Sequence, residues 1–423
     1  MKTFITSGAI PARELKMEAL TSLSASFEKL CLAAGLEALG DMMARDAQAA
    51  CGPRHARSEA RRAPRWGKTT GKIGFHGGKV AIERPRLRGF DGKEQALSSW
   101  EAALREDWLG SWAMNQMLIN VATRKFARSV RLPEGDIPVP AGAGLSKSAA
   151  SRRFVALSAA RMKDWMTSDV AGLDLLVIQI DGIHMAEDLI LVVAIGVDAR
   201  GDKHPLGLAE GVTENAATVQ ALIDNLIERG LDPAVPRLFI IDGAKALSKA
   251  IRRTFGDAAV QRCQIHKARN IVERLPKSLH ASVRRVLRQA WELDDADKAE
   301  KLLRNLARRL ERDWAGVAGS ILEGIDELLT VTRLCLPKQL RRSLACTNII
   351  ENLMSTVRRV CRNVKRWRSA SMAMRWTAAA MQEAAKSFRR LKAHKQLPTL
   401  RVALEAHKTK NSHGILACQA NAA

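Results

Sequence analysis

Five short apolar runs between residues 173 and 263 constrain the fold more than any other feature of the sequence. They are rich in Val, Ile and Leu, have the length of buried β-strands, and span residues 173–181, 189–198, 203–210 (the weakest), 237–242 and 260–263. Residues 213–229 and 244–255, which separate the last three runs, instead have apolar residues at helical spacing. The pattern therefore predicts three strands, then a helix, a strand, a helix and a strand.

This order of elements is that of the ribonuclease H-like fold, in which helices flank a mixed β-sheet. Other α/β folds share parts of the order, so the order alone leaves those folds open. We expect an α/β core in two parts, residues 171–272 and 341–395. Residues 273–340 between them have helical patterns only and are rich in Leu, Ala, Arg and Glu.

Three regions precede this core and a short tail follows it. Residues 1–60 have helical spacing and lead into an exposed basic linker over residues 54–65, and residues 61–100 predict a small β module with a hairpin around Gly77-Gly78. Residues 101–170 are helical with two Pro- and Gly-containing breaks. Residues 396–423 form the C-terminal tail.

A helix of the DNA-binding kind is predicted to begin near residue 145. A serine there precedes small residues and a basic face. Ser148, Arg152 and Arg153 are spaced to reach bases or phosphates, as residues of a recognition helix do. The alternative is a helix whose arginines face water. Residues 101–170 are therefore a candidate helix-turn-helix-like DNA-binding region.

The net charge predicts a polyanionic partner. The 423 residues include 68 Lys and Arg against 44 Asp and Glu, which gives +24, and the isoelectric point is near 10.3. Such a field attracts polyanions and speeds association with them, and nucleic acid is the leading candidate. A ribosome-associated or merely soluble basic protein is the alternative.

Cysteine usage and hydropathy predict a cytoplasmic, nucleoid-associated protein with no membrane partner. The seven cysteines are scattered singly without a CxxC pair, which argues against a disulfide framework. The longest apolar stretch, residues 189–197, is less than half of the roughly 20 residues that a membrane-spanning helix needs. The N-terminus lacks the sustained apolar segment of a secretory signal.

Two aspartates are candidate metal ligands. Asp181 and Asp242 each close an apolar run and each precede a glycine. A strand that ends in a carboxylate presents it at the rim of a sheet, where ligands of α/β proteins bind. Two adjacent carboxylates repel each other unless a cation neutralises them, and oxygen ligands favour Mg or Mn. The alternative is a pair of Asp-Gly turns without chemistry.

Glu351 is the best candidate for a third carboxylate, since two divalent ions need shared and terminal ligands. It lies in the first turns of a helix predicted to continue through a basic segment with candidate phosphate ligands Arg358, Arg359, Arg362, Lys365, Arg366 and Arg368. Glu351 is alternatively a helix-capping residue. Glu210, Glu214 and Glu323 compete with it, and spacing does not exclude them.

The basic segment extends over residues 355–395, with twelve Lys and Arg against one acidic residue, more than a solvated helix face requires. Trp367 and Trp376 lie among these residues, where they either stack on an unpaired base or, as we favour, pack in the core. Cys263 and His266 form a single C-x-x-H. A zinc site needs about four ligands, so we favour a hydrogen-bonding or DNA-contacting His266. His184 is ambiguous between a site residue and a capping residue.

Taken together, these segments resemble the bacterial insertion-sequence transposases related to the eukaryotic Mutator elements. The matching motifs are DGIH at 181–184, GVTEN at 211–215, IDG at 241–243, QRCQIHKARN at 261–270, TNIIEN at 347–352 and KRW at 365–367. The resemblance extends from about residue 170 to 390 and more loosely to residues 144–154. It implies a ribonuclease H-like catalytic core that is interrupted by an all-helical insertion between Asp242 and Glu351.

The resemblance also implies a catalytic Asp, Asp, Glu triad at Asp181, Asp242 and Glu351 that holds two Mg (or Mn) ions, with Cys263 and His266 as a characteristic pair near the site. The implied function is a DDE-type transposase that binds terminal inverted repeats and target DNA as a homodimer or higher oligomer and joins strands by transesterification. The rivals are a silent DNA-binding regulator derived from a transposase, a nuclease of the same fold, and a ribosomal or nucleoid structural protein.

Overall fold

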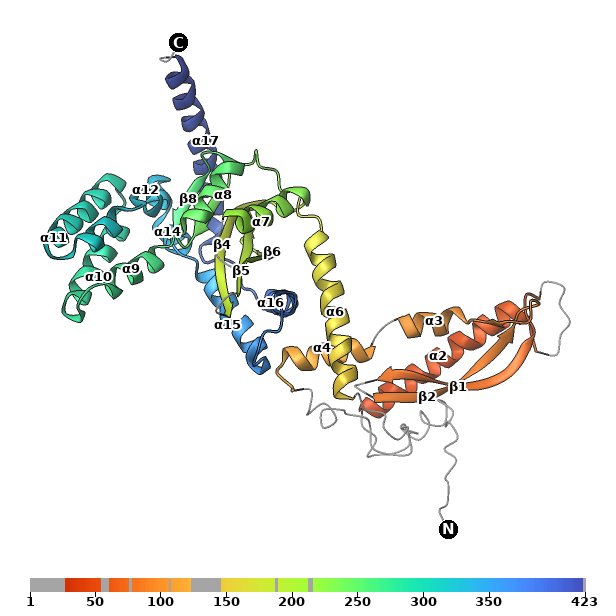
Figure 1. Ribbon diagram of the computed structural model, residues 1–423. Coiled ribbons are helices and arrows are strands. Elements are labelled where there is room, and N and C mark those ends of the chain that lie inside the picture. Colours follow the sequence, from red (N-terminus) through yellow and green to blue (C-terminus); the bar gives the residue numbers. More distant parts are fainter. Residues whose placement is uncertain are drawn as a thin grey trace. The chain divides into compact units, whose positions relative to one another are not determined.

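The computed structural model describes residues 27–54, 61–75, 78–105, 108–122, 146–186, 189–211 and 216–420. The chain forms two compact units, Met1–Leu157 and Ser158–Ala423 (Figure 1). The finer division expected from the sequence stays a prediction. No helix among the described residues is long and apolar enough to cross a membrane.

The first unit packs a long helix on a small antiparallel sheet. Its elements are α2 (Phe27–Cys51), β1 (Arg65–Phe75), β2 (Gly78–Arg88), β3 (Glu94–Gln95), α3 (Ser98–Arg105), α4 (Trp108–Leu118) and the start of α6 (Lys147–Thr167). The predicted hairpin is confirmed, with β1 paired to β2. Met43, Val80 and Trp100 share one core, and Ala63, within the segment expected to be an exposed linker, is buried in it.

The second unit is built on a five-stranded mixed sheet. In chain order its first elements are β4 (Leu175–Ala186), β5 (Leu189–Asp198), β6 (Lys203–Gly211), α7 (Ala216–Glu228), β7 (Leu238–Ile241), α8 (Lys245–Phe255) and β8 (Ala259–Arg262). In space the strand order is β6-β5-β4-β7-β8. The β5 strand is antiparallel to both neighbours, whereas β4, β7 and β8 run parallel. The predicted α/β class with a mixed sheet is confirmed.

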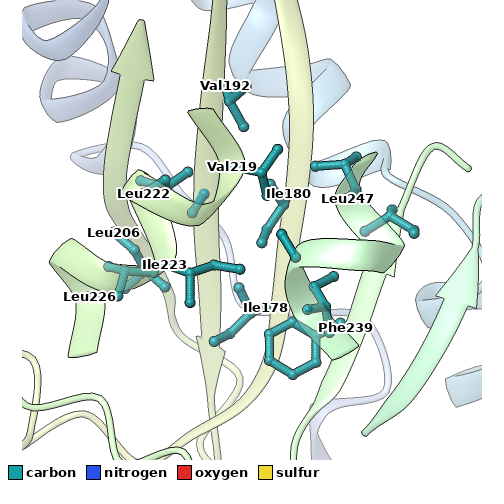
Figure 2. Packing of buried hydrophobic residues seen from close by; sticks show 14 of the residues in the cluster. Ile178, Ile180, Val192, Leu206, Val219, Leu222, Ile223, Leu226, Phe239 and Leu247 are labelled. Carbon is teal, nitrogen blue, oxygen red and sulfur yellow. The ribbon is translucent and has the colours of Figure 1, made fainter. Parts of the chain in front are cut away.

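Helices cover both faces of this sheet because its strands are apolar on both sides. Ile178, Ile180 and Phe239 point to one face and pack against α7 and α8 (Figure 2). On the other face, α15 (Asn348–Val360) contacts β4 and α16 (Ala370–Ala385) contacts β6. Residues that alternate along one strand therefore meet different helices.

The segment between the two predicted parts of the core is helical, as expected. It follows α9 (Gln264–Glu273), contains α10 (Lys277–Glu292), α11 (Ala296–Leu322), α12 (Ile325–Leu328) and α13 (Thr330–Arg333), and ends within α14 (Lys338–Leu344). Val283, Leu303 and Leu310 belong to a separate apolar core that α9, α10 and α11 share. Trp314 interrupts α11 with non-helical backbone angles.

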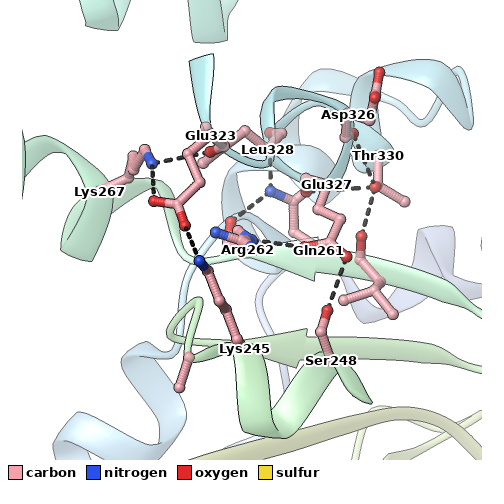
Figure 3. A network of polar contacts seen from close by, with 12 residues as sticks. Lys245, Ser248, Gln261, Arg262, Lys267, Glu323, Asp326, Glu327, Leu328 and Thr330 are labelled. Atoms are coloured by element: carbon pink, nitrogen blue, oxygen red, sulfur yellow. Dashed lines mark hydrogen bonds and ion pairs between the residues drawn. The ribbon is translucent and has the colours of Figure 1, made fainter. Parts of the chain in front are cut away.

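A polar network joins these helices to the sheet (Figure 3). Glu327 of α12 accepts hydrogen bonds from Ser248 Oγ of α8 at 2.8 Å and Arg262 Nε of β8 at 2.6 Å. Gln261 of β8 donates from Nε2 to the Leu328 carbonyl at 2.9 Å. Since these groups lie largely away from water, the network specifies where the helical segment docks.

The predicted continuous basic helix over residues 354–395 is wrong. The helix α15 ends at Val360 and is followed by η2 (Cys361–Asn363), α16, η3 (His394–Gln396) and α17 (Leu397–Ala420). Val364 is extended after η2, and the Ser369 hydroxyl accepts a hydrogen bond from Met372 N at 3.2 Å, which caps a new helix. Local capping therefore outweighs the helical composition of the segment.

Candidate active site

The register of three parallel strands brings the candidate aspartates to one level of the sheet. Ile180 of β4 is in register with Ile241 of β7, which is in register with Arg262 of β8. The next residue along each strand is Asp181, Asp242 or Cys263. Neighbouring strands lie about 4.8 Å apart, so the two aspartates are neighbours at the edge of the sheet where the parallel strands β7 and β8 end.

The expectation that Asp181 closes its strand is wrong. Residues 182–186 continue β4 and stay paired with β5, for example Gly182 with Val192. The parallel pairing with β7 is what stops, at Ile180. Asp181 therefore lies where β4 passes beyond the shorter β7, and it is 8% exposed.

Strand alternation assigns these residues to the face under α15. Gln179, two residues before Asp181, donates from Nε2 to the Cys346 carbonyl, just before α15, at 3.3 Å. Side chains two residues apart point the same way, so Asp181 shares that face. His184 has the opposite parity on β4 and is exposed, which separates it from Asp181.

Each aspartate also accepts a hydrogen bond from a backbone N–H close to it in the chain. The Asp181 Oδ1 atom accepts a hydrogen bond from Gly182 N at 2.9 Å, and Asp242 Oδ1 accepts one from Ala244 N at 2.8 Å. Gly243, which lies between Asp242 and Ala244, has a φ of 110°, a conformation that favours glycine. The turn role and the site role are therefore compatible for Asp242.

Glu351 reaches the same edge from the first turn of α15. Its Oε1 atom lies 3.5 Å from His266 Nε2 of α9, and His266 also experiences the charge of Asp181. Thr347 Oγ1, at the start of α15, donates to Cys263 Sγ at 3.6 Å. The C-x-x-H pair thus joins the end of β8 to the helix that presents Glu351.

The pair perturbs its own ionisation. The pKa of His266 is raised to about 9, chiefly by hydrogen bonding to Cys263. Burial lowers this pKa, and the charges of Asp181 and Glu351 raise it further. Burial raises the pKa of Cys263, but hydrogen bonding to His266 and Thr347 outweighs burial and leaves that pKa below its ordinary value. The site therefore favours a cationic imidazole next to the carboxylates.

The side chains of Asp181, Asp242 and Glu351 are not close enough together to form a metal site. Among the residues that the structure describes, no three His, Cys, Asp or Glu side chains are close enough to hold a metal ion. The competing Glu323 is paired with Lys245 of α8 at 3.6 Å and with Lys267 of α9 at 3.9 Å. Glu210 is exposed on the edge strand β6, and Glu214 lies outside the described residues.

The predicted DNA-binding residues fall into two groups. Ser148 and Arg152 are exposed on α6 in the first unit and Arg153 is half-buried there. In the second unit the predicted ligands are Arg358, Arg359, Arg362, Lys365, Arg366 and Trp367. All are exposed except Trp367, which is half-buried. Only Arg358 and Arg359 lie on α15. Trp376 is 6% exposed, in agreement with a core role.

Two buried amides and one stack of arginines on a tryptophan were not predicted from the sequence. Gln179 and Gln261 are fully buried and tether the segments before α15 and after α12; a glutamine inside an apolar run was the available sign. In the β module, the guanidinium carbons of Arg86 and Arg88 lie 4.4 and 4.5 Å from the centre of the Trp66 ring. Such stacking depends on cross-strand pairing that sequence spacing does not reveal.

Comparison with known proteins assigns the chain to a family. Residues 14–390 match the family model described as "Transposase, Mutator family". The chain belongs to the Mutator family of transposases. This confirms the resemblance predicted from the motifs, and the family's members act on DNA.

Transposases of bacterial insertion sequences are among the relatives of this Mutator-family chain. It is 31% identical over 222 residues to that of IS6120 from Mycolicibacterium smegmatis, covering 51% of this chain and 67% of that protein. It is 31% identical over 168 residues to that of IST2 from Acidithiobacillus ferrooxidans, covering 40% and 56%. The transposase of IS256 in transposon Tn4001 from Staphylococcus aureus is 30% identical over 173 residues, covering 40% and 42%. The matches thus span two thirds of the first relative and about half or less of the other two.

Proposed function

We propose that this Mutator-family chain is a DDE-type DNA transposase of an insertion sequence. It binds the terminal inverted repeats of its element, hydrolyses phosphodiester bonds to free 3′ hydroxyls, and joins those ends to target DNA. The observations on which this rests are that Asp181 and Asp242 directly follow residues of β4 and β7 that are in register, and that Glu351 contacts His266 of α9. Family membership supplies the second argument.

The proposal includes a ribonuclease H-like core with a helical insertion. The strand order β6-β5-β4-β7-β8, with only β5 antiparallel to its neighbours, supports that core. Helices α9 to α14 lie in the chain between Asp242 and Glu351 and bury an apolar core of their own. Both features agree with an insertion in the catalytic core.

Two Mg²⁺ or Mn²⁺ ions are the proposed cofactors, held by Asp181, Asp242 and Glu351. The donor chemistry fits, because all three ligands are carboxylates and hard divalent cations prefer oxygen. When bound, such ions activate the attacking oxygen and stabilise the leaving oxygen of an in-line displacement. The chain itself makes no covalent intermediate in this proposal.

The protein's contribution is positioning. Asp181 lies within β4 and Asp242 directly follows β7, and each carboxylate accepts a hydrogen bond from a nearby backbone N–H. Cys263 and His266 are positioning residues for Glu351, through the Thr347 hydroxyl and the contact between His266 Nε2 and Glu351 Oε1. Preorganised groups of this kind lower the barrier because they do not have to reorient during the reaction.

Double-stranded DNA is the proposed partner, as both the element ends and the target. The exposed basic residues on α6 and those from α15 to Trp367 are its proposed ligands, and they position the duplex through phosphates. Synapsis of two ends requires two active sites, so we propose a homodimer or higher oligomer that acts in the cytoplasm on the nucleoid.

Strand cleavage and joining by purified protein test the proposal. A labelled duplex with the inverted repeat that flanks the gene is incubated with Mg²⁺ or with chelator. Asp181→Asn and Glu351→Gln are expected to abolish cleavage and joining while end binding stays within a few fold of wild type. Glu273→Gln, an equivalent change at an exposed position of α9, is the matched control and is expected to stay active.

The outcomes separate the rivals. Metal-dependent joining that both substitutions remove supports the transposase. Tight end binding without any cleavage identifies a regulator, and cleavage without joining identifies a nuclease. Loss of binding together with activity in Asp181→Asn and Glu351→Gln would assign these carboxylates a structural role instead.

A further inference from the structure

A basic groove lies beside α15 in the second unit. Its volume is about 830 Å³, and its walls come from the start of β6, from α14, from α15 and from the chain that follows α16. Its basic side chains are Lys203, Arg342, Arg389, Arg390 and Lys392, and its lining contains no acidic residue. Positive charge without internal compensation indicates an anionic ligand.

Three of these cations have no anion of their own. Arg342 pairs with Glu292 at 3.0 Å and Arg390 pairs with Asp202 at 2.9 Å, both acids outside the lining. Within the described ranges, the side chains of Lys203, Arg389 and Lys392 make no hydrogen bond or ion pair.

Lys203 is the most constrained of the three. It is half-buried at the first position of β6, and burial lowers its pKa below the ordinary value without any acid to offset the shift. A desolvated cation costs free energy unless it is paired. A ligand that brings negative charge into the groove would remove this cost.

The polar lining suits phosphate oxygens. Asn348, Asn352 and Thr356 line the groove from α15, and residues four apart lie on one face of a helix. Asparagine and threonine side chains and helix N-termini all donate hydrogen bonds to DNA phosphates. Asn348 is the first residue of α15, so the positive end of the helix dipole also faces the groove.

The groove lies next to the proposed active site without overlapping it. Glu351 is on the same helix as Asn348 and Asn352 but is directed toward His266 of α9. Glu351 is three residues from Asn348, and residues three apart are neighbours on a helix, with about 5–6 Å between their Cβ atoms. One DNA strand advances about 3.4 Å per nucleotide, so a strand that runs from the groove to Glu351 covers about two nucleotides.

We propose that this groove binds the sugar–phosphate backbone of DNA about two nucleotides from the bond that the carboxylate site cleaves. The inference rests on the proposed function for the reaction that follows, but binding itself does not require catalysis. It also assigns a role to Lys203, Arg389 and Lys392, of which the first belongs to a strand far from the others in sequence.

The test measures DNA affinity as a function of salt, in chelator, for wild type and for the double variant Arg389→Gln/Lys392→Gln. Each lost phosphate contact removes about 0.9 from the slope of log affinity against log salt. The double variant is therefore expected to lose about 1.8 in slope and, by the same relation, roughly 60-fold in affinity at 0.1 M salt. Lys249→Gln/Arg253→Gln, an equal charge change at exposed positions of α8, is expected to change the slope by less than half as much.

Neutral methylphosphonate linkages, placed singly along the duplex, then locate the contact. Wild type is expected to lose affinity when the linkage lies about two nucleotides from the cleaved bond, and the double variant is expected to be insensitive there. The proposal is overturned if the double variant and the control have equal slopes. It is also overturned if the double variant binds poly-glutamate more weakly than wild type does but binds DNA equally well. Because chelator prevents catalysis, a failure of strand joining leaves this result unaffected.

Discussion

Replacing Glu327 by glutamine tests whether the polar network of Figure 3 secures the helical segment. The Glu327 carboxylate accepts hydrogen bonds from Ser248, Arg252 and Arg262 at 2.8, 2.8 and 2.6 Å. The side chains of Glu327 and Arg262 are only 12% and 11% exposed. The substitution preserves the shape of the side chain but leaves the Arg262 cation without its anion.

The magnitude follows from burial. Removing one partner of a buried ion pair costs about 3–5 kcal/mol, and because the side chains here keep some exposure and glutamine keeps one acceptor, we expect about 3 kcal/mol. For a unit of this size that corresponds to a fall in melting temperature of roughly 6–12 °C. The exposed pair between Glu383 and Lys386, at 2.7 Å, gives the matched control Glu383→Gln, with an expected loss below about 1 kcal/mol.

The dependence on pH provides a second, independent check. Burial raises the pKa of Glu327, but the hydrogen bonds from Arg252, Arg262 and Ser248 outweigh burial and leave it below the ordinary value of 4.5. A carboxyl with a depressed pKa stabilises the fold fully above its unfolded-state pKa, about 4.3, and this stabilisation is lost as the pH falls through the folded-state pKa. The difference between wild type and Glu327→Gln is therefore expected to be constant near neutrality and to shrink below about pH 4.

Urea unfolding followed by circular dichroism, from pH 7 down to pH 3.5, measures both effects. Limited proteolysis reports in addition whether residues 273–340 are cleaved more readily in the variant. A loss below 1 kcal/mol at pH 7, or a difference from wild type that widens on acidification, would refute the assignment of Glu327 as a buried, ionised anchor.

Two further predictions concern the second unit. Phe239→Ala removes a 1% exposed side chain from the sheet core and is expected to lower the unfolding free energy by about 3–5 kcal/mol. The control Val402→Ala, at a 70% exposed position, is expected to lower it by less than about 0.5 kcal/mol. A small loss for Phe239→Ala would contradict the packing of Figure 2. Gly201→Ala would place a Cβ against the His394 side chain at a φ of 85°, so a loss of at least 1–3 kcal/mol is expected, whereas Gly172→Ala, with open space around it, should be neutral in the same melts.

Much of the fold was predictable because local patterns specify local structure. The apolar run at residues 189–198 coincides with β5, and the run at 203–210 matches β6 to within one residue, since a strand buried on both faces must be apolar throughout. The sequence also singled out Asp181, Asp242, Cys263, His266 and Glu351 as site residues, and their role stays a prediction. The structure sets the first three directly after in-register residues and pairs His266 with Glu351.

Other features depend on neighbours that local sequence does not specify. The β4 strand continues past Asp181 because β5 lies beside it. The predicted helix after Val360 breaks because Ser369 offers a new cap at the start of α16. Gln179 and Gln261 are ordinary polar residues in the sequence and become tethers only when the carbonyls of Cys346 and Leu328 approach them.

By itself, the sequence determined the α/β class, the basic character of the chain, the candidate carboxylates and the motifs of the Mutator family. These properties depend on composition, on periodicity and on short spacings, all of which act along the chain. Only the tertiary structure decided that Asp181 and Asp242 are level, and that Lys203 and Arg389 line one groove. Strand pairing and helix packing set those positions, because they join residues that are far apart in the chain through burial and hydrogen bonding.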